Sequence, residues 1–360
     1  MLQILKSYIS QINEQMTFQT DTVQISNSTD ILKTEEMIDF IKSDFGKRLA
    51  HNLNIVKVSA PVIVSDGTGI NDDLNGIEKP VSFQIKSLDN KKAVIIQSLA
   101  KWKRMRLKYY DIEAGKGILT DMRAIRPDEK LSPIHSVYVD QWDWEKHILQ
   151  DQRTLHYLKT TIEAIYSAFK ATEEKLFEKH PWLVPQLPDK ITFVHAEELL
   201  RQYPYLNPKQ RENAAARAHG AVFIIGIGNN LSNGEPHDGR APDYDDWSSL
   251  NEDGYNGLNG DIIFWNPSLD SAFEISSMGI RVDRRSMKHQ LKICCCQERE
   301  NLLFHRLLLS DQLPLSIGGG IGQSRLCMFF LRKTHIGEVQ SSIWSEEVLM
   351  KAEEKGIKLL

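Results

Sequence analysis

Residues 125–145 read Ile-Arg-Pro-Asp-Glu-Lys-Leu-Ser-Pro-Ile-His-Ser-Val-Tyr-Val-Asp-Gln-Trp-Asp-Trp-Glu. The end of this stretch, residues 137–144, alternates with a period of two, which predicts a β-strand. On such a strand Gln141 and Asp143 point to one face, while the intervening tryptophans point to the other. Each face carries both apolar and polar side chains, as is typical of a strand that lines a site.

The residues before this strand predict the other arm of a hairpin. A strand ending at Arg126, a loop and the return strand would bring Arg126 onto the surface that carries Gln141 and Asp143. A guanidinium can bind a phosphate through two hydrogen bonds, and a buried carboxylate can hold an ammonium group. The alternative is a solvated hairpin with a surface arginine, but the large aromatic side chains on its other face favour a half-buried one.

Two further segments, residues 34–61 and 318–325, also predict short structural units. Residues 34–53 predict an amphipathic helix, residues 55–60 a short apolar strand, and Pro61 ends that strand. Residues 318–325, Gly-Gly-Gly-Ile-Gly-Gln-Ser-Arg, predict a glycine-rich turn that opens a helix with Arg325 in its first turn. They lack the Lys-Ser/Thr of a Walker loop. Each segment alone has an ordinary structural explanation, but the three in this order form a specific combination.

The remaining pattern predicts an α+β fold, an antiparallel or mixed sheet flanked by helices. Hairpin-like neighbours and few βαβ units argue against a doubly wound parallel sheet. We expect a helical N-terminal extension over residues 1–30 and one catalytic domain over residues 31–360. Further strands are predicted at 81–85, 94–99, 191–195, 221–226, 261–266 and 273–277, and further helices at 101–110, 153–179, 284–295, 297–310 and from residue 324 onward.

Composition narrows the class of protein. Of the 360 residues, 41% are hydrophobic and 26% charged, which suits a globular protein with a substantial core. The net charge of −4 predicts no basic face for nucleic acid or an anionic membrane. No apolar run approaches the roughly 18 residues of a membrane span. Cys294, Cys295, Cys296 and Cys327 have no metal-ligand spacing, so we expect reduced thiols in a soluble, cytoplasmic protein.

Several segments carry a closer resemblance. They are Ser-Leu-Ala-Lys-Trp-Lys-Arg at 98–104, Arg-Pro-Asp-Glu at 126–129, residues 135–145, Ala-Pro-Asp-Tyr-Asp-Asp-Trp at 241–247, Leu-Asn-Gly-Asp-Ile at 258–262, Phe-Glu-Ile-Ser-Ser-Met-Gly-Ile-Arg at 273–281 and the glycine run. Together they resemble the bacterial ammonia-dependent asparagine synthetases, the aspartate–ammonia ligases. The helix–strand–Pro, Arg-x-x-Glu and Gly-x-Gly-x-x-Arg segments match motifs 1, 2 and 3 of the class II aminoacyl-tRNA synthetase fold.

The resemblance implies an activity with two steps. The β-carboxylate of L-aspartate attacks the α-phosphate of ATP, which gives β-aspartyl-AMP and pyrophosphate. Ammonia then displaces AMP and forms L-asparagine. The implied substrates are aspartate, ATP and ammonium, with Mg²⁺ as the metal, and the implied assembly is a homodimer built on the motif 1 segment.

The resemblance also implies roles for individual residues. The nucleotide would be bound by Arg126, Glu129, His135, Gly320, Gly322 and Arg325, and the magnesium by Asp261 and Glu274. Aspartate would be bound by Ser98, Lys103, Asp143, Asp243, Ser277 and Arg281, with Asp245 as an alternative to Asp243. Asp72 would accept the proton that ammonium loses, with Asp73 as its rival, while Arg126 and Gln141 would act directly on the reacting groups.

Three other classes of protein are less consistent with the sequence. An aminoacyl-tRNA synthetase would need an RNA-binding domain and a basic surface, and this sequence predicts neither. A non-catalytic relative would be expected to have lost at least one of Arg126, Gln141, Glu274 or Arg325, all of which are present. A glutamine-dependent synthetase would carry a nucleophilic cysteine directly after the initiator methionine, whereas residue 2 is Leu.

Overall fold

The computed structural model describes residues 30–71 and 78–360 of the chain. Asp72 and Asp73 lie outside the described residues, as do residues 1–29 of the predicted N-terminal extension. The division of the chain at residue 30 therefore stays a prediction. The chain is helical from residue 30 to residue 53, so the predicted helix is confirmed and begins before Thr34.

An eight-stranded sheet forms the centre of the protein, in the order β1-β5-β6-β11-β10-β9-β8-β7. Its strands are β1 (Ile55–Lys57), β5 (Gly117–Ile125), β6 (Tyr138–His147), β7 (Thr192–His195), β8 (Ala221–Ile225), β9 (Asn259–Asn266), β10 (Ser271–Ile280) and β11 (Ser316–Gly322). β1 pairs with β5 and β7 with β8 in parallel, while the other neighbours are antiparallel. This confirms the predicted mixed sheet.

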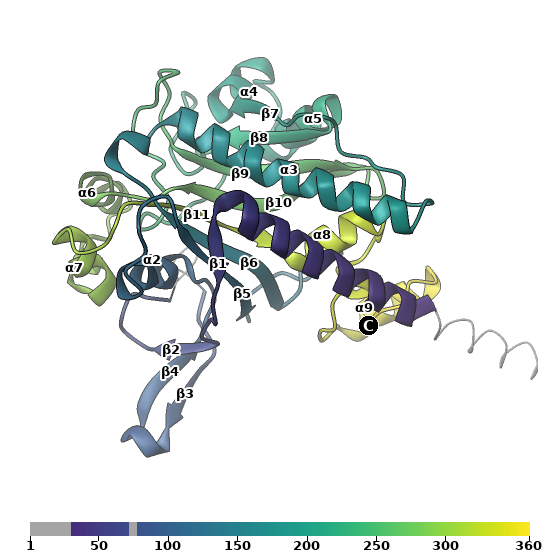
Figure 1. Cartoon of the computed structure of the whole chain (residues 1–360), viewed down its shortest axis with the longest axis horizontal. Helices are drawn as coiled ribbons and strands as arrows, with labels where there is room; N and C mark the ends of the chain where they lie inside the picture. Colours follow the sequence, from purple (N-terminus) through teal and green to yellow (C-terminus); the bar gives the residue numbers. More distant parts are fainter. Residues whose placement is uncertain (1–29, 72–77) are drawn as a thin grey trace, which may run out of the picture.

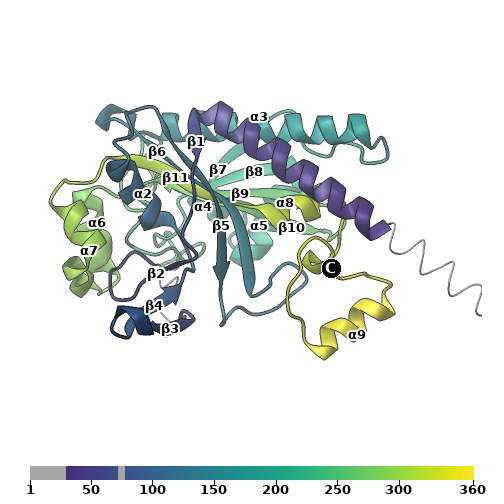
Figure 2. The same ribbon diagram turned by 60° about the horizontal axis from the view of Figure 1, so that its bottom comes forward.

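One face of the sheet is covered by three helices. The helix 30–53 and α3 (Leu155–Lys179) run across it, and α8 (Gln323–Phe330) packs beside them (Figures 1 and 2). The rings of Phe45, Phe169 and Phe264 meet in this layer, with centroids 4.7 and 5.3 Å apart. Burial of large aromatic and aliphatic side chains supplies most of the stabilisation of such a layer. The main hydrophobic core therefore lies between these helices and the sheet.

The other face is covered only toward its two edges. Near β5, α2 (Ala100–Tyr109) packs through Trp102 and Leu107 onto Ile118 and Met122. Near β8 and β9, α4 (Ala196–Gln202) and α5 (Pro208–His219) pack onto a second apolar cluster. The central strands β6, β11 and β10 lie between these two covered regions. They are therefore left open for a cavity.

A small sheet in the order β2-β4-β3 stands beside the main one (Figure 1). Its strands are β2 (Ile63–Ser65), β3 (Ser82–Ile85) and β4 (Lys91–Ile95). The strand predicted at 94–99 is thus displaced toward the N-terminus. Asp89 and Asn90 have positive φ angles of 52° and 59°, which form a tight turn directly before Lys91. The Ser98 hydroxyl accepts a hydrogen bond from the Ala100 amide, so the chain already enters α2 there.

The glycine-rich segment is the clearest correction to the expected secondary structure. It is not a turn but the strand β11, which pairs with β6 on one side and β10 on the other. Side chains of its neighbours fill the space above the glycines. A Cβ on Gly318 would overlap the Glu145 carboxylate, and one on Gly320 would overlap the Gln141 amide. The helix predicted to follow is confirmed as α8, with Arg325 in its first turn.

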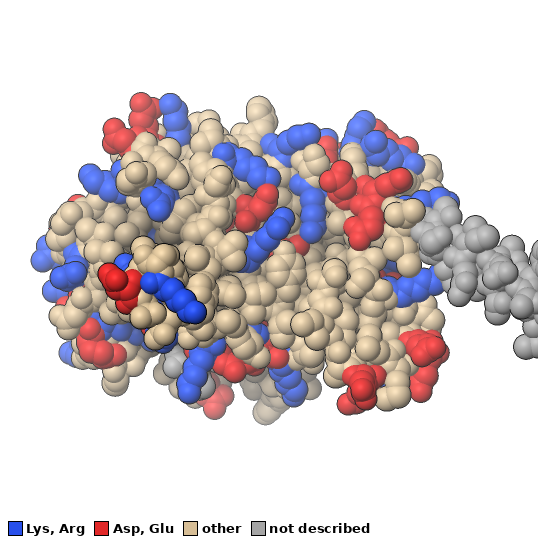
Figure 3. Space-filling model, turned by 90° about the horizontal axis from the view of Figure 1, so that it is seen from below, with Lys and Arg blue, Asp and Glu red and all other residues tan. Residues whose placement is uncertain are grey.

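Three other helices complete the described structure. α6 (Arg284–Ile293) and α7 (Leu303–Leu309) lie together at the α2 end of the sheet, and α9 (Glu346–Glu354) lies near the C-terminus (Figure 2). Where one helix was predicted over 297–310, a short 3-10 turn, Gln297–Asn301, precedes α7. Among the described helices, none has both the length and the apolar character that crossing a membrane requires. On the face drawn in Figure 3, acidic and basic side chains are interspersed.

Candidate active site

A cavity of about 730 Å³ lies over the open centre of the sheet. Its lining includes fourteen of the predicted site residues: Ser98, Lys103, Arg126, Glu129, His135, Gln141, Asp143, Asp261, Glu274, Ser277, Arg281, Gly320, Gly322 and Arg325. They come from the start of α2, from β6, β9, β10 and β11, from the first turn of α8, and from the loop between β5 and β6. The structure therefore brings together residues that are more than 200 positions apart in the sequence.

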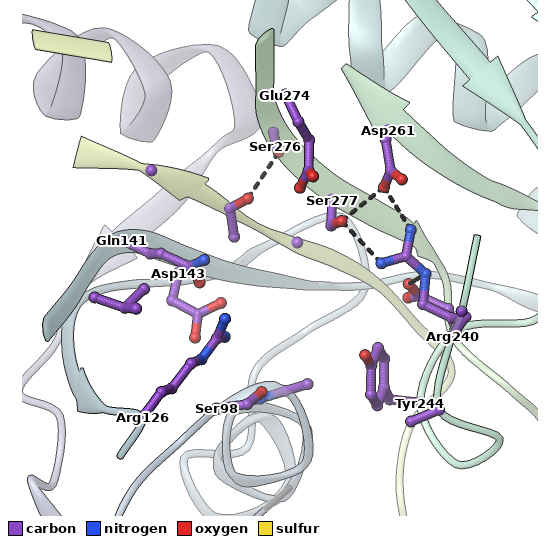
Figure 4. A pocket seen from close by; sticks show the side chains of 18 of the residues that line it. Ser98, Arg126, Gln141, Asp143, Arg240, Tyr244, Asp261, Glu274, Ser276 and Ser277 are labelled. Atoms are coloured by element: carbon purple, nitrogen blue, oxygen red, sulfur yellow. Dashed lines mark hydrogen bonds and ion pairs between the residues drawn. The ribbon is translucent and has the colours of Figure 1, made fainter. Parts of the chain in front are cut away.

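The period of two on β6 sets the orientation of its side chains. Gln141 and Asp143 line the cavity, and Figure 4 shows them on the same strand facing Arg126. Trp142 and Trp144 are 1% and 0% exposed and belong to the core on the opposite face. The predicted alternation and the half-buried hairpin are both confirmed. Glu145 lies on the same face of β6 as Gln141 and Asp143, and it was not among the predicted site residues.

One group of cavity residues contains buried charges of both signs. The Lys103 ammonium contacts the Asp143 carboxylate and donates to the Gly319 carbonyl at 3.1 Å. Burial lowers the pKa of Lys103 and raises the pKa of Asp143, since each charge is removed from water. Their ion pair opposes both shifts. An ammonium and a carboxylate from a ligand could exchange partners with this pair at little electrostatic cost.

Arg281 completes this group. Its guanidinium forms an ion pair with Glu145 at 2.9 Å and contacts Asp245. Burial would raise the pKa of Glu145, but the charges of Arg281 and Lys103 outweigh burial and hold that pKa below its usual value. Glu145 also accepts a hydrogen bond from the Ser316 hydroxyl at 2.6 Å. Arg281 is thereby fixed in orientation while it still lines the cavity.

A second group of cavity residues is dominated by arginines. Arg325 donates to the Glu274 carbonyl at 2.9 Å and to His135 Nε2 at 2.9 Å. Burial and the charge of Arg325 lower the pKa of His135 to about 4, so this imidazole is neutral near pH 7. Its Nδ1 then donates to the Ser132 hydroxyl, 2.8 Å away. His135 thus orients the Arg325 guanidinium without adding a charge.

Arg126 retains unused hydrogen-bonding capacity. Its Nη2 donates to the Gln97 carbonyl at 3.4 Å, whereas its buried Nε has no hydrogen-bond partner among the described residues. A buried donor without a partner is energetically unfavourable. An anionic ligand in the cavity would satisfy it.

Two carboxylates from neighbouring strands face this part of the cavity. Asp261 on β9 and Glu274 on β10 lie close together in Figure 4. The pairing of these strands shifts between Glu274 and Ser276, and such a bulge redirects side chains. Burial, together with the nearby charge of Glu274, raises the pKa of Asp261 to about 6. The described residues contain no group of three or more His, Cys, Asp or Glu side chains that could hold a metal.

Of the predicted site residues that the structure describes, Asp243 is the one that does not line the cavity. Its carboxylate is fully buried behind the wall, where it binds Lys101 and His305 at 3.0 Å and Arg299 at 3.3 Å. Burial would raise the pKa of Asp243, but the charge of Lys101 and the hydrogen bonds from His305 and Lys101 hold that pKa below its usual value. Asp245, the alternative, lines the cavity instead. In the segment 241–247 the carboxylate that faces the cavity is therefore Asp245.

Other lining residues were missed in the sequence. Arg240 lies between Asp261, Ser277 and Asp245, and Tyr244 lies beside it (Figure 4). Glu145, which does not line the cavity but binds Arg281, could have been found, because it continues the spacing of two from Gln141 and Asp143. Arg240 directly precedes the segment 241–247, but nothing in its immediate neighbours indicates that its side chain reaches β9.

Comparison with known proteins gives the same assignment across nearly the whole chain. A family model described as aspartate-ammonia ligase matches residues 32–356. The chain is 53% identical over 328 residues to an aspartate–ammonia ligase of Parabacteroides distasonis, which covers 91% of this chain and 95% of the relative. It is 54% identical over 334 residues to the aspartate–ammonia ligase of Fusobacterium nucleatum, which covers 93% and 99%.

Solved structures with the same fold are more distant in sequence. The asparaginyl-tRNA synthetase of Pyrococcus horikoshii in complex with asparaginyl-adenylate matches with a TM-score of 0.62 at 15% identity, over 87% of this chain and 67% of that one. The Entamoeba histolytica asparaginyl-tRNA synthetase with asparaginyl-adenylate gives a TM-score of 0.61 at 12% identity, over 86% and 66%. The fold is thus that of a class II synthetase catalytic domain. Since the family model and the relatives at over 50% identity span almost all of it, the chain belongs to the aspartate–ammonia ligase family.

Proposed function

We propose that this protein makes L-asparagine from L-aspartate and ammonia at the expense of ATP, through a β-aspartyl-AMP intermediate. The observation that carries the proposal is the presence of two sets of charged side chains in one cavity. One set contains buried charges of both signs, Lys103, Asp143 and Arg281 among them, which suits a zwitterionic amino acid with an extra carboxylate. The other set contains Arg126, Arg325 and two carboxylates, which suits a nucleoside triphosphate and its cation.

Aspartate would bind by exchanging partners with charges that are already paired. Its ammonium replaces Lys103 at Asp143, and its carboxylates are held by Lys103 and Arg281. Ser98 and Ser277 line the same cavity and offer hydroxyl groups to the substrate. Each charge of the substrate thus meets an opposite charge, which a buried site requires.

In the first step, an oxygen of the β-carboxylate attacks the α-phosphorus of ATP, and pyrophosphate leaves. Negative charge spreads over the phosphate oxygens in such a transfer, so catalysis consists mainly of positioning and of neutralising that charge. The free Nε of Arg126 supports its role at the α-phosphate. Arg325, oriented by His135, would hold the nucleotide, with Glu129 and the backbone at Gly320 and Gly322 along its path.

In the second step, ammonium first loses a proton. The resulting ammonia attacks the acyl carbon, the adduct gives a second proton to water, AMP leaves with the electrons of the broken C–O bond, and asparagine forms. Asp72 is the proposed proton acceptor on the basis of the resemblance. Gln141 lines the cavity next to Asp143 and would orient the acyl group or the ammonia through its amide.

Asp261 and Glu274 would hold Mg²⁺. The pKa of Asp261 is raised partly because a second carboxylate lies nearby, and a cation between the two would relieve that repulsion. Two carboxylates with water and phosphate oxygens are a common ligand set for this ion. When bound, Mg²⁺ would neutralise charge on the phosphates. The Arg240 guanidinium already forms an ion pair with Asp261, so a bound Mg²⁺ would share this carboxylate with Arg240.

The nature of the products tests the proposal directly. The purified protein with ATP, aspartate and ammonium should release AMP and pyrophosphate together with asparagine, in equal amounts, because attack is at the α-phosphorus. Chromatography of labelled ATP is the measurement. Formation of ADP would contradict attack at the α-phosphate, and charging of tRNA with aspartate or asparagine would favour a synthetase instead.

The protein should be a two-fold dimer. β1 is an edge strand of the main sheet, and the side chain of Val56 on it is 59% exposed. Val62 and Ile63, which follow in the chain, are 53% and 42% exposed. An exposed apolar edge of this kind favours pairing with a second copy. Sedimentation at micromolar concentration should give twice the 41.2 kDa of one chain. A monomer with full activity would contradict the prediction.

We also propose that the protein works in the cytoplasm on small molecules. All four cysteines are free thiols, which suits a reducing compartment. Fractionation of the cells that make the protein would test this.

A further inference from the structure

Arg240 is held by acidic and hydroxyl partners in the cavity. Its guanidinium contacts the Asp261 carboxylate and donates to the Ser277 hydroxyl at 2.8 Å, and its Nε is 3.5 Å from Asp245 Oδ2. Figure 4 shows the guanidinium between Asp261 and Ser277, below Glu274. Only 9% of the Arg240 side chain is exposed. A cation is therefore already bound where the proposed function requires another one.

This ion pair has a clear electrostatic reason. The Asp261 side chain is 11% exposed, and Glu274 adds a second negative charge on the next strand. A buried carboxylate is stable in its charged form only when it is paired. Glu274 already has a positive partner, because its carboxylate lies 3.7 Å from the Arg325 guanidinium. Arg240 therefore provides the balancing charge for Asp261.

The same carboxylate oxygen is used twice. Asp261 Oδ1 accepts hydrogen bonds both from Arg240 and from the Ser277 hydroxyl, the latter at 2.6 Å. A divalent cation bound to this carboxylate would share it with the guanidinium and would repel the guanidinium. The metal and Arg240 therefore compete for Asp261.

We propose that Arg240 is an internal counter-ion that occupies Asp261 in the absence of a divalent cation and is transferred to the triphosphate when the cation and nucleotide bind. This inference rests on the proposed function, because it assumes that a metal–triphosphate complex is the ligand. The released guanidinium lines the same cavity as Arg126 and Arg325. A metal–triphosphate complex supplies a partner to each half of the broken ion pair, since guanidinium binds phosphate well.

Two consequences follow for binding. Without nucleotide, Arg240 weakens the binding of the cation. With nucleotide, the displaced guanidinium gains a phosphate partner, so nucleotide and cation should strengthen each other's binding by the same factor. The exchange also keeps the charge at Asp261 balanced at every stage.

The test is a titration of the protein with Mn²⁺ in the absence of nucleotide. The free ion is measured by electron paramagnetic resonance. Arg240→Met should bind Mn²⁺ about tenfold more tightly than the unchanged protein, because the competitor is removed and couplings of this kind are typically 5- to 150-fold. The enhancement of Mn²⁺ affinity by ATP should be reduced in the same variant, and the KM for ATP should rise.

Two controls make the comparison specific. Arg217→Met removes an exposed arginine of α5, 3.9 Å from Asp270 and outside the cavity lining, and should leave Mn²⁺ affinity unchanged. Arg240→Met combined with Asp261→Asn should lose the gain, because the carboxylate that Arg240 blocks has been removed. A gain that survives in the double variant would place the Mn²⁺ elsewhere and overturn the proposal.

Unchanged or weaker Mn²⁺ binding by folded Arg240→Met would also overturn it. If that variant does not fold, Arg240→Lys answers the same question. A lysine keeps one charge but cannot bridge Asp261 and Asp245 through separate nitrogens, so a smaller gain is expected and no gain would refute the proposal. The Mn²⁺ titration needs no turnover. A failure to form AMP and asparagine would therefore refute the proposed function separately.

Discussion

Replacement of Asp72 by Asn is expected to abolish asparagine formation while the first half-reaction survives. An amide cannot accept the proton that ammonium must lose, and the loss of a general base typically costs about 10²- to 10⁴-fold. Aspartate-dependent exchange of pyrophosphate into ATP should remain close to its original rate. This exchange requires Arg126, the metal and bound aspartate, but it requires no ammonia.

Arg126→Ala provides the contrast. Charge on the α-phosphate develops in the first step, so this variant should lose exchange and asparagine formation together, each by at least about 10²-fold. Asp73→Asn, at the next position in the sequence, is the matched control and should leave both rates nearly unchanged. If Asp72→Asn loses exchange as completely as Arg126→Ala, Asp72 holds aspartate rather than ammonia. If Asp73→Asn has the larger effect on asparagine formation, Asp73 is the proton acceptor.

Gly320→Ala is expected to lower the activity strongly with little loss of folded protein. A methyl group at this position would overlap the Gln141 amide and lie 3.4 Å from Asp143 Oδ1. Both side chains face the open cavity, so they can move away without disturbing the core. A displacement of about 1 Å in a catalytic group can cost about 10²-fold in rate, and we expect kcat/KM to fall by this amount.

The measurement combines steady-state kinetics with thermal unfolding. A loss of activity with a melting temperature close to that of the unchanged protein would support displacement of site residues. A large fall in the melting temperature would instead mean that β11 cannot accept a side chain at all. Full activity in Gly320→Ala would contradict a role for Gln141 at the reacting groups.

Much of the fold could be predicted from local patterns. The alternation on β6 and the helical spacing of α3 are properties of short segments, and both are confirmed. The glycine run was harder to interpret, because an isolated glycine sequence is typical of a turn. Its role as a central strand depends on Glu145 and Gln141, which belong to a distant segment and fill the space above the glycines. α4 and α5 were missed altogether.

For the site, too, local sequence patterns could not predict what depends on distant residues. Residues in continuous motifs, such as Arg126 and Arg325, were placed correctly in one cavity. Within the segment 241–247, however, the two candidate aspartates have similar neighbours in the sequence. Lys101 and His305 turn Asp243 away from the cavity, while Arg281 draws Asp245 toward it. That distinction depends on three partners from other elements, and no local pattern contains it.

The alternation on β6 also limits how the chain can misfold. A shift of one residue in its pairing with β11 would turn every side chain to the opposite face of the sheet. Gln141, Asp143 and Glu145 would then enter the aromatic core, where unpaired charges are very costly, and two tryptophans would face water. The polar residues on this face of β6 therefore also act against a slipped sheet. A copy of the protein with β6 out of register should fail to fold, so quality control in the cell can recognise it as unfolded instead of leaving it as an inert enzyme.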